Sequence, residues 1–291
     1  MQESIDIDAL WEYDDPAASE GRFRQALETA QGDARLELLT QVARTYSLRG
    51  RFDEAHALLD EVAPQLADAG QRPHVRYLLE RGRTFNSAGD KETARRVFAQ
   101  AWERAVPAQE IGLAVDAAHM LAIAHASTPA AIEWNRRGLE LARPSADPKA
   151  RALIPAMLNN TAWDLHGLGR HAEALVLFEE AEAEWRARDR QPQIRIARWS
   201  VARCLRSLGR HAEALAILRE LEAEHRAAGS ADGYVFEEIA ECLAAQGEHE
   251  QARPYFRLAA TELGRDEWFV AHEPARLAAL RERAGPAATT A

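Results

Sequence analysis

The heptapeptide Gly-Arg-His-Ala-Glu-Ala-Leu occurs twice in this chain, at positions 169–175 and 209–215. Related segments, in which an alanine follows a glycine by five positions, begin at Gly50, Gly89 and Gly247. The glycines of this set are almost evenly spaced, except that the interval from Gly89 to Gly169 is twice as long as the others and leaves room for another unit near position 127. A fixed period of this size is typical of proteins built from one repeated supersecondary unit. The sequence therefore predicts six units.

Each unit has the pattern of two helices that flank the glycine. Before the glycine, small and apolar residues recur with gaps of four and three, as in Leu158, Ala162 and Leu165. After it, Ala174 and Phe178 begin the same spacing. Such residues lie on one face of a helix, and a glycine readily ends a helix in a left-handed conformation. No hairpin turn of the Asn-Gly type and no sustained alternation of period two is present, so an all-α chain is predicted.

This pattern resembles the tetratricopeptide repeat (TPR). The resemblance covers positions 33–264 and implies a right-handed helical-repeat solenoid of about six helix pairs with N- and C-terminal capping helices. The units here run to about 40 residues, against about 34 residues in the usual unit. The difference implies helices about a turn longer, and long-helix members of the family are often peptide or protein receptors. The family's small residue in the first helix falls on Ala43, Gly82, Ala162, Ala202 and Ala240, and its alanine in the second helix on Ala55, Ala94, Ala174, Ala214 and Ala252.

The third unit is degenerate. Its turn has Ser127 in place of the glycine, although the segment that follows fits the second half of a unit. The six units are placed at about 33–70, 71–107, 108–144, 148–189, 191–228 and 230–264.

The ends of the chain suggest caps on this solenoid. Asp15 before Pro16 is typical of a helix start, so we expect an acidic N-terminal tail over 1–15 and a capping helix over 16–32. A closing helix over 265–284, broken near Pro274, and a disordered tail over 285–291 are expected at the other end. No composition shift marks a second domain, and one continuous core is expected.

Charge and composition exclude several classes of protein. The net charge of −10 argues against binding to nucleic acid or to anionic membranes. No apolar run is long enough to span a membrane, and positions 1–16 lack the basic and apolar regions of a secretory signal. Two cysteines cannot form a disulfide framework. These features predict a cytoplasmic globular protein, and the preference for arginine over lysine with a high alanine content favours a bacterial source.

Catalytic and metal-binding motifs are not found, which predicts a chain that is not an enzyme and holds no cofactor and no metal. The histidines that follow the turns share one repeat position, which favours a structural role. Cys204 and Cys242 also share one position, which indicates packing, with a redox pair as the alternative. An enzyme with an unrecognised site, built for example from His119, His166 and Glu241, is a further hypothesis.

The first helices show a different chemistry on a second face. In the resembled family these helices line a concave groove, at positions one residue beyond the core stripe. Tryptophan and arginine dominate binding hot spots, arginine suits carboxylates, and asparagine can bond to a peptide backbone. We therefore predict a groove for an acidic protein or peptide segment, formed by Arg44, Arg83, Asn86, Asn159, Asn160, Trp163, His166, Trp199, Arg203 and Arg206.

Two interpretations of these residues are open. In the first, the groove is free, and replacing Arg83 and Arg203 by glutamate weakens partner binding without unfolding the chain. In the second, the arginines pair with carboxylates on adjacent helices and both tryptophans are partly core.

Three functions follow from the pattern. The first is a non-enzymatic binding scaffold. The second is a bacterial sensor of a signal peptide or small ligand, which is disfavoured because such receptors usually carry an N-terminal effector or DNA-binding module and there is no room for one before position 33. The third is the enzyme mentioned above. The tail also carries apolar residues, among them Ile5, Ile7 and Trp11, that predict docking along its own solenoid or on a second protomer, which would give a homodimer.

Overall fold

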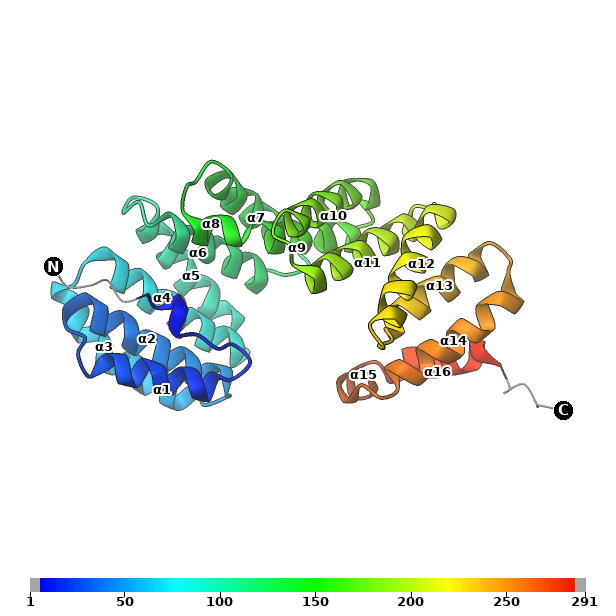
Figure 1. The fold of residues 1–291 in the computed structure, drawn as a ribbon. Coiled ribbons are helices and arrows are strands. Elements are labelled where there is room, and N and C mark those ends of the chain that lie inside the picture. Colours follow the sequence, from blue (N-terminus) through cyan, green and yellow to red (C-terminus); the bar gives the residue numbers. More distant parts are fainter. Residues whose placement is uncertain (1–5, 286–291) are drawn as a thin grey trace. The chain divides into compact units, whose positions relative to one another are not determined.

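The computed structural model describes residues 6–285, which contain helices and no strand. The all-α fold of repeated helix pairs predicted from the sequence is confirmed (Figure 1). The α-helices are α1 (Pro16–Leu27), α2 (Gly32–Leu48), α3 (Phe52–Val62), α4 (Gln71–Ser87), α5 (Lys91–Ala105), α6 (Ile111–Ala124), α7 (Pro129–Ala142), α8 (Pro148–Ala152), α9 (Ile154–Gly167), α10 (His171–Arg186), α11 (Gln191–Ser207), α12 (His211–Ala227), α13 (Gly233–Ala245), α14 (His249–Leu263), α15 (Glu267–His272) and α16 (Pro274–Ala284). Two 3₁₀ helices, η1 (Asp8–Leu10) and η2 (Ala63–Asp68), complete the set.

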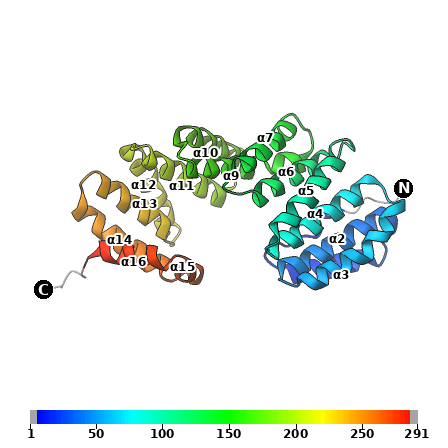
Figure 2. The same cartoon turned by 180° about the vertical axis from the view of Figure 1, so that it is seen from behind.

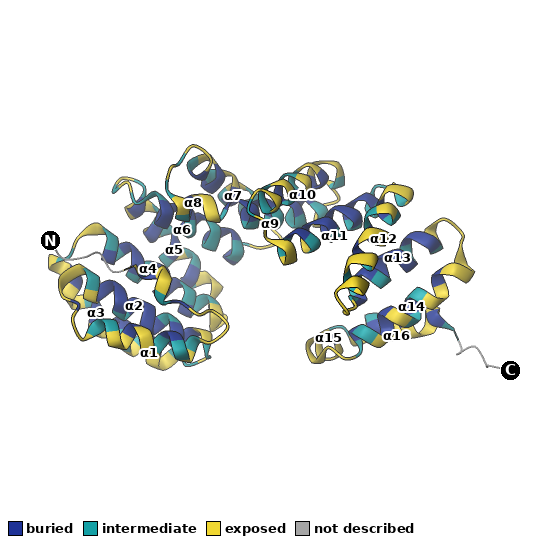
Figure 3. Cartoon of the chain, in the orientation of Figure 1, coloured by how far each residue is buried: buried dark blue, intermediate teal, exposed yellow. Residues whose placement is uncertain are grey.

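The helices group into two compact units, Met1–Met157 and Leu158–Ala291, with the boundary inside α9. We refer to them as unit 1 and unit 2 and describe each by itself. Within each unit, buried residues lie where neighbouring helices face one another, and exposed residues lie on the outside (Figure 3). The domain boundaries expected from the sequence, with one core over 33–264, stay predictions.

In unit 1 the first helices of successive pairs, α2, α4 and α6, pack against one another, and each also packs against its own second helix (Figures 1 and 2). The small residue of the repeat allows this close approach. A Cβ atom added to Gly82 of α4 would lie 2.5 Å from the ring of Phe98 on α5. Phe98 is fully buried, so the ring cannot withdraw into solvent.

The turns inside the pairs have the left-handed backbone that the sequence predicts. Gly50, Gly89, Gly169 and their counterparts have φ angles between 72° and 92°. In the third pair Ser127 adopts a φ of 64° between α6 and α7, where no glycine stands. The degenerate third repeat is therefore a helix pair like the others.

Unit 2 repeats the arrangement with α11, α13 and their second helices. Phe178 of α10 is buried, in the same repeat position as Phe98. At the C-terminal end α15 stops at His272 and α16 starts at Pro274, so the expected closing helix is divided at the proline. The tail expected over 285–291 lies outside the described residues, apart from Gly285.

The described part of the N-terminal tail docks on its own unit. Asp15 caps α1 by accepting hydrogen bonds from the backbone amides of residues 17 and 18. Ile7 and Trp11 are buried in the same cluster as Phe23, and the Trp11 indole donates a 3.0 Å hydrogen bond to Gln41 of α2. Asp8 forms a 2.8 Å ion pair with Lys149. Residues 6–15 therefore dock along helices of their own chain. Ile5 lies outside the described residues.

Candidate partner-binding surface

The two predicted arginines of unit 1 are held by internal contacts. The Arg83 guanidinium on α4 lies 2.7 Å from Glu80 and 2.6 Å from both carboxylate oxygens of Asp116 on α6. Arg44 on α2 lies 3.9 Å from the same Glu80, and its guanidinium stands over the rings of Trp11 and Tyr13 at 5.1 and 5.5 Å. Two cations and two anions therefore balance in unit 1, which is the pairing described by the second interpretation of these residues.

Burial makes this network of unit 1 costly to disturb. The Glu80 side chain is fully buried and also accepts a 3.3 Å hydrogen bond from Gln41. Burial raises the pKa of Asp116, but the adjacent Arg83 outweighs it and holds that pKa below its usual value. Asn86, the third predicted residue of unit 1, is half-buried, and its side-chain oxygen has no hydrogen-bond partner among the described residues.

Unit 2 holds a different balance of charge. Arg206 on α11 contacts both carboxylate oxygens of Glu238 on α13, at 2.6 and 3.2 Å, and Arg203 lies 3.1 Å from the same carboxylate. The neighbouring acids of α13 are already neutralised, since Glu237 pairs with Arg276 and Glu241 with Arg283. Two guanidinium groups thus share one carboxylate, and one positive charge is left in excess.

A row of aromatic rings runs beside these arginines. Trp163, Trp199, Tyr234 and Phe269 come from α9, α11, α13 and α15, with successive ring centroids 5.8, 5.9 and 5.9 Å apart. Trp199 also donates a 3.2 Å hydrogen bond to the backbone carbonyl of Tyr234. Trp163 packs edge-on against the buried Phe178 at 4.9 Å. The first three rings are half-buried, so each keeps part of its surface exposed.

The remaining predicted residues of unit 2 lie on α9. His166 makes a 2.9 Å hydrogen bond with the Ser207 hydroxyl, which also accepts a 2.7 Å hydrogen bond from Arg203. Asn159 and Asn160 are half-buried, and neither side chain has a hydrogen bond among the described residues. The structure therefore brings Trp163, His166, Trp199, Arg203 and Arg206 together. We call this set, with the two asparagines, the unit 2 surface.

The pKa of His166 predicts a dependence of stability on pH. Burial, with further contributions from Arg203, His171 and Arg206, lowers this pKa from 6.5 to about 4. The unfolded chain therefore binds more protons than the folded chain between these values, and stability is lost as the pH falls from 6.5 to about 4. As the pH falls over this range, we expect the free energy of unfolding to decrease less in the His166→Gln variant than in the wild-type chain. Urea unfolding at several pH values measures the difference, and two parallel curves would contradict it.

A hollow next to Trp199 was not predicted from the sequence. It has a volume of about 440 Å³ and lies between the start of α11 and the start of α13. The repeat spacing marked Trp199 as a surface residue, but it gave no signal that two neighbouring turns would leave space between them. The hollow is lined by Pro192, Arg195, Ile196, Trp199, His225, Asp232, Tyr234 and Val235.

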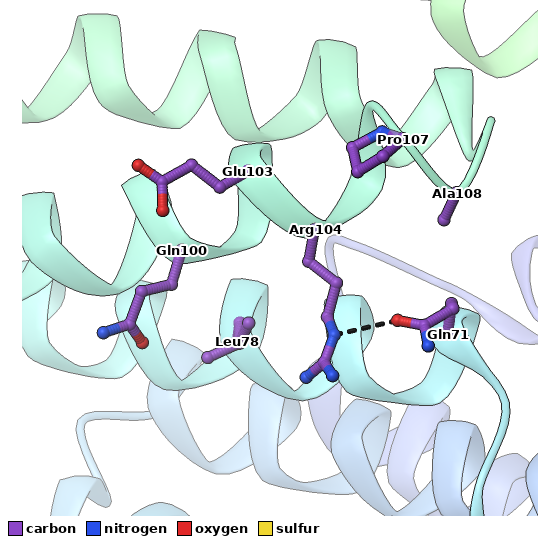
Figure 4. A pocket seen from close by; sticks show the side chains of 7 residues that line it. All are labelled: Gln71, Leu78, Gln100, Glu103, Arg104, Pro107 and Ala108. Carbon is purple, nitrogen blue, oxygen red and sulfur yellow. Dashed lines mark hydrogen bonds between the residues drawn. The ribbon is translucent and has the colours of Figure 1, made fainter.

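A larger hollow in unit 1 is less suited to a ligand. It measures about 670 Å³ and lies beside α4, α5 and the turn after α5 (Figure 4). Arg104 spans it with a 2.9 Å hydrogen bond to Gln71, and most of its lining is exposed and polar. Leu78 is its one large apolar side chain, so it offers little surface that a ligand could remove from water.

The residues proposed for an enzyme site are divided between the two units, and those proposed for a redox pair are both buried. His119 belongs to unit 1, whereas His166 and Glu241 belong to unit 2 and have the partners given above. Cys204 and Cys242 are free and buried, and burial raises the pKa of both thiols, that of Cys242 to about 12. Residues 6–285 contain no group of three histidine, cysteine or acidic side chains able to hold a metal ion. In the same range no helix has the length and apolar character needed to span a bilayer.

Comparison with known proteins agrees with the helix pairs. Tetratricopeptide repeat models match residues 35–63, 156–180 and 196–220, each of which contains the turn of one pair. No curated protein matches the sequence.

Several solved structures share the fold at low sequence identity. A signal transduction ATPase with a tetratricopeptide repeat sensor from Pyrococcus horikoshii has a TM-score of 0.73 at 10% identity, covering 90% of this chain and 41% of its own, so this chain spans less than half of that protein. The apo form of RapI has a TM-score of 0.71 at 12% identity, covering 86% and 71% of the two chains. The apo quorum sensor NprR from B. thuringiensis has a TM-score of 0.63 at 15% identity, covering 97% and 80%. Residues 35–63, 156–180 and 196–220 therefore match the tetratricopeptide repeat, and the fold of the described residues is similar to that of solved tetratricopeptide repeat proteins.

Proposed function

We propose that this chain is a non-enzymatic scaffold that binds an acidic protein or peptide segment on the unit 2 surface. The excess positive charge carried by Arg203 and Arg206 beside the aromatic row supports the proposal most directly. A carboxylate placed there would complete a set of two cations and two anions, the balance that unit 1 has within itself. The half-buried rings of Trp163 and Trp199 would add apolar contact, as such residues do in binding hot spots.

The fold is compatible with this function. The quorum sensor NprR has been solved in complex with its cognate peptide NprX, and that structure covers 97% of this chain at 15% identity with a TM-score of 0.52. The free amides of Asn159 and Asn160 could bond to the backbone of an extended segment. The chain's net charge of −10 argues against nucleic acid and anionic membranes as partners.

The proposal predicts a specific loss from Arg203→Gln. This change removes the excess charge but leaves Glu238 paired with Arg206, so the fold should be retained. We expect peptides selected on the wild-type chain from a random library to be acidic, and their affinity to fall about tenfold or more, because a hydrogen bond to a charged group contributes about 1.5–3 kcal/mol. Fluorescence anisotropy with the labelled peptides measures this affinity.

Arg210→Gln is the matched control for this experiment. Arg210 is an exposed residue whose one ion-pair partner among residues 6–285 is the exposed Glu213, and its replacement changes the net charge by the same amount. Affinity should stay at the wild-type level in this variant. Equal losses in the two variants would mean that net charge, rather than the unit 2 surface, attracts the peptide.

Sensing of a signal peptide or small ligand is the second candidate function. The hollow beside Trp199 favours it, because its volume lies in the range of small-ligand sites. A sensor must differ in conformation between free and bound states, so a change in the radius of gyration on peptide binding would distinguish it from a rigid scaffold. Location in the cytoplasm and a homodimer formed through the N-terminal tail stay predictions.

A further inference from the structure

The hollow beside Trp199 combines apolar walls with one charged side chain, Arg195, that has no partner in the described part of the chain. Ile196 is 62% exposed at its edge, next to Trp199 on the same face of α11, and the buried Val235 forms part of the wall. Single exposed apolar residues are ordinary on protein surfaces. Here the exposed residue borders a concave site that a ligand can fill, which is the arrangement expected of a side-chain pocket.

The charges around the hollow narrow the choice of ligand. Asp232 is already used, since it accepts a 2.9 Å hydrogen bond from the Tyr234 amide at the start of α13 and lies 3.7 Å from the His225 ring. Arg195 lines the same hollow and has no hydrogen bond or ion pair among residues 6–285. A guanidinium in this position is available to a carboxylate, which it can bind through two parallel hydrogen bonds.

We propose that this hollow is an anchor site for one large apolar side chain of the bound segment, with a carboxylate next to that side chain paired to Arg195. The inference rests on the proposed function and names the ligand that the unit 2 surface selects. The carboxylate can come from the C-terminus of the segment or from an aspartate or glutamate within it, and both sources share the chemistry that Arg195 recognises.

The spacing along α11 indicates how far apart the two carboxylates of such a segment should lie. Arg195 and Arg203 are eight positions apart on the helix, which corresponds to a rise of about 12 Å. An extended peptide advances about 3.3 Å per residue. A segment lying along α11 should therefore carry its second acidic residue, the one facing Arg203, about three or four positions from the anchor.

Peptide selection on the wild-type chain tests this pattern. Two random octapeptide libraries are displayed, one ending in a free carboxylate and the other followed by a constant Gly-Ser segment. We expect enriched peptides to combine a large apolar residue and adjacent carboxylate with an acidic residue three or four positions away. Enrichment confined to the first library identifies a C-terminal carboxylate, and enrichment in both identifies an acidic side chain. Acidic peptides without an apolar anchor would overturn the inference.

Three variants separate this inference from the proposed function. Arg195→Gln and Ile196→Ser should each weaken the enriched peptides about tenfold or more while leaving the melting temperature unchanged, because Arg195 has no partner to lose and Ile196 is exposed. Arg203→Gln should weaken only peptides that carry the distal acidic residue. If Arg203→Gln weakens peptide binding but Arg195→Gln and Ile196→Ser do not, the anchor site is wrong and the proposed function stands. If Arg195→Gln and Ile196→Ser weaken peptide binding but Arg203→Gln does not, the anchor site stands and the proposed role of Arg203 is wrong. If neither library yields an enriched sequence, the anchor site and the proposed function are both wrong.

Discussion

Replacing Phe178 with alanine is expected to lower the free energy of unfolding by about 3–5 kcal/mol, the usual range for an aromatic residue removed from a core. Phe178 is 1% exposed and lies between the helices of its pair, in edge-on contact with Trp163. The cavity left by the ring cannot be filled by solvent-facing side chains. Urea unfolding followed by circular dichroism measures the loss.

Val176→Ala in the same helix is the control for Phe178→Ala. Val176 lies two positions away but is 61% exposed, and surface changes of this kind usually stay within about 0.5 kcal/mol. The comparison separates the buried face of α10 from its exposed face. Similar losses in the two variants would show that the faces of this helix have been assigned wrongly.

Replacing Arg83 with glutamate is expected to destabilise unit 1 by about 3–5 kcal/mol, because removing one partner of a buried ion pair leaves uncompensated charge. The new carboxylate would join Glu80, which is fully buried, and Asp116. The free-groove interpretation expected Arg83→Glu together with Arg203→Glu to spare the fold, whereas the ion pairs of Arg83 predict a loss of stability. A thermal or urea unfolding curve of the variant measures the effect.

Arg136→Glu provides the matched comparison for Arg83→Glu. Arg136 also lies in unit 1 and pairs with two acids, Glu133 and Glu140, but all three side chains are exposed, so little stability should be lost. Adding Asp116→Arg to Arg83→Glu should recover part of the loss by reversing the pair. An Arg83→Glu chain as stable as the Arg136→Glu chain would contradict a structural role for Arg83.

The same surface position therefore has different surroundings in the two units. Arg44 and Arg83 in unit 1 are matched by Glu80 and Asp116, and the N-terminal segment covers Arg44 with two aromatic rings. In unit 2, Arg203 and Arg206 both form ion pairs with Glu238, and the nearby Glu241 is paired with Arg283. A ligand for the chain is consequently proposed on unit 2, although the groove predicted from the sequence included residues of both units.

The amino-acid sequence by itself determined the period, the helix pairs and the buried face of each helix. These depend on local properties: glycine or Ser127 in the left-handed turn, and apolar residues spaced by the turn of a helix, such as Ala174 and Phe178. The sequence also predicts the helix face on which each arginine lies, because a residue's place in the repeat fixes the direction in which its side chain leaves the helix.

Only the tertiary structure decided which charges are paired and where a ligand could enter. Asp116 reaches Arg83 from 33 residues away, and Trp11 meets Gln41 from a segment with no counterpart in the repeat. The hollow that Arg195 lines depends on how the start of α13 packs beside α11. Repeat position gives the face of a helix but not the side chain that a neighbouring helix places against it, and that pairing sets both the charge balance and the space left for a partner.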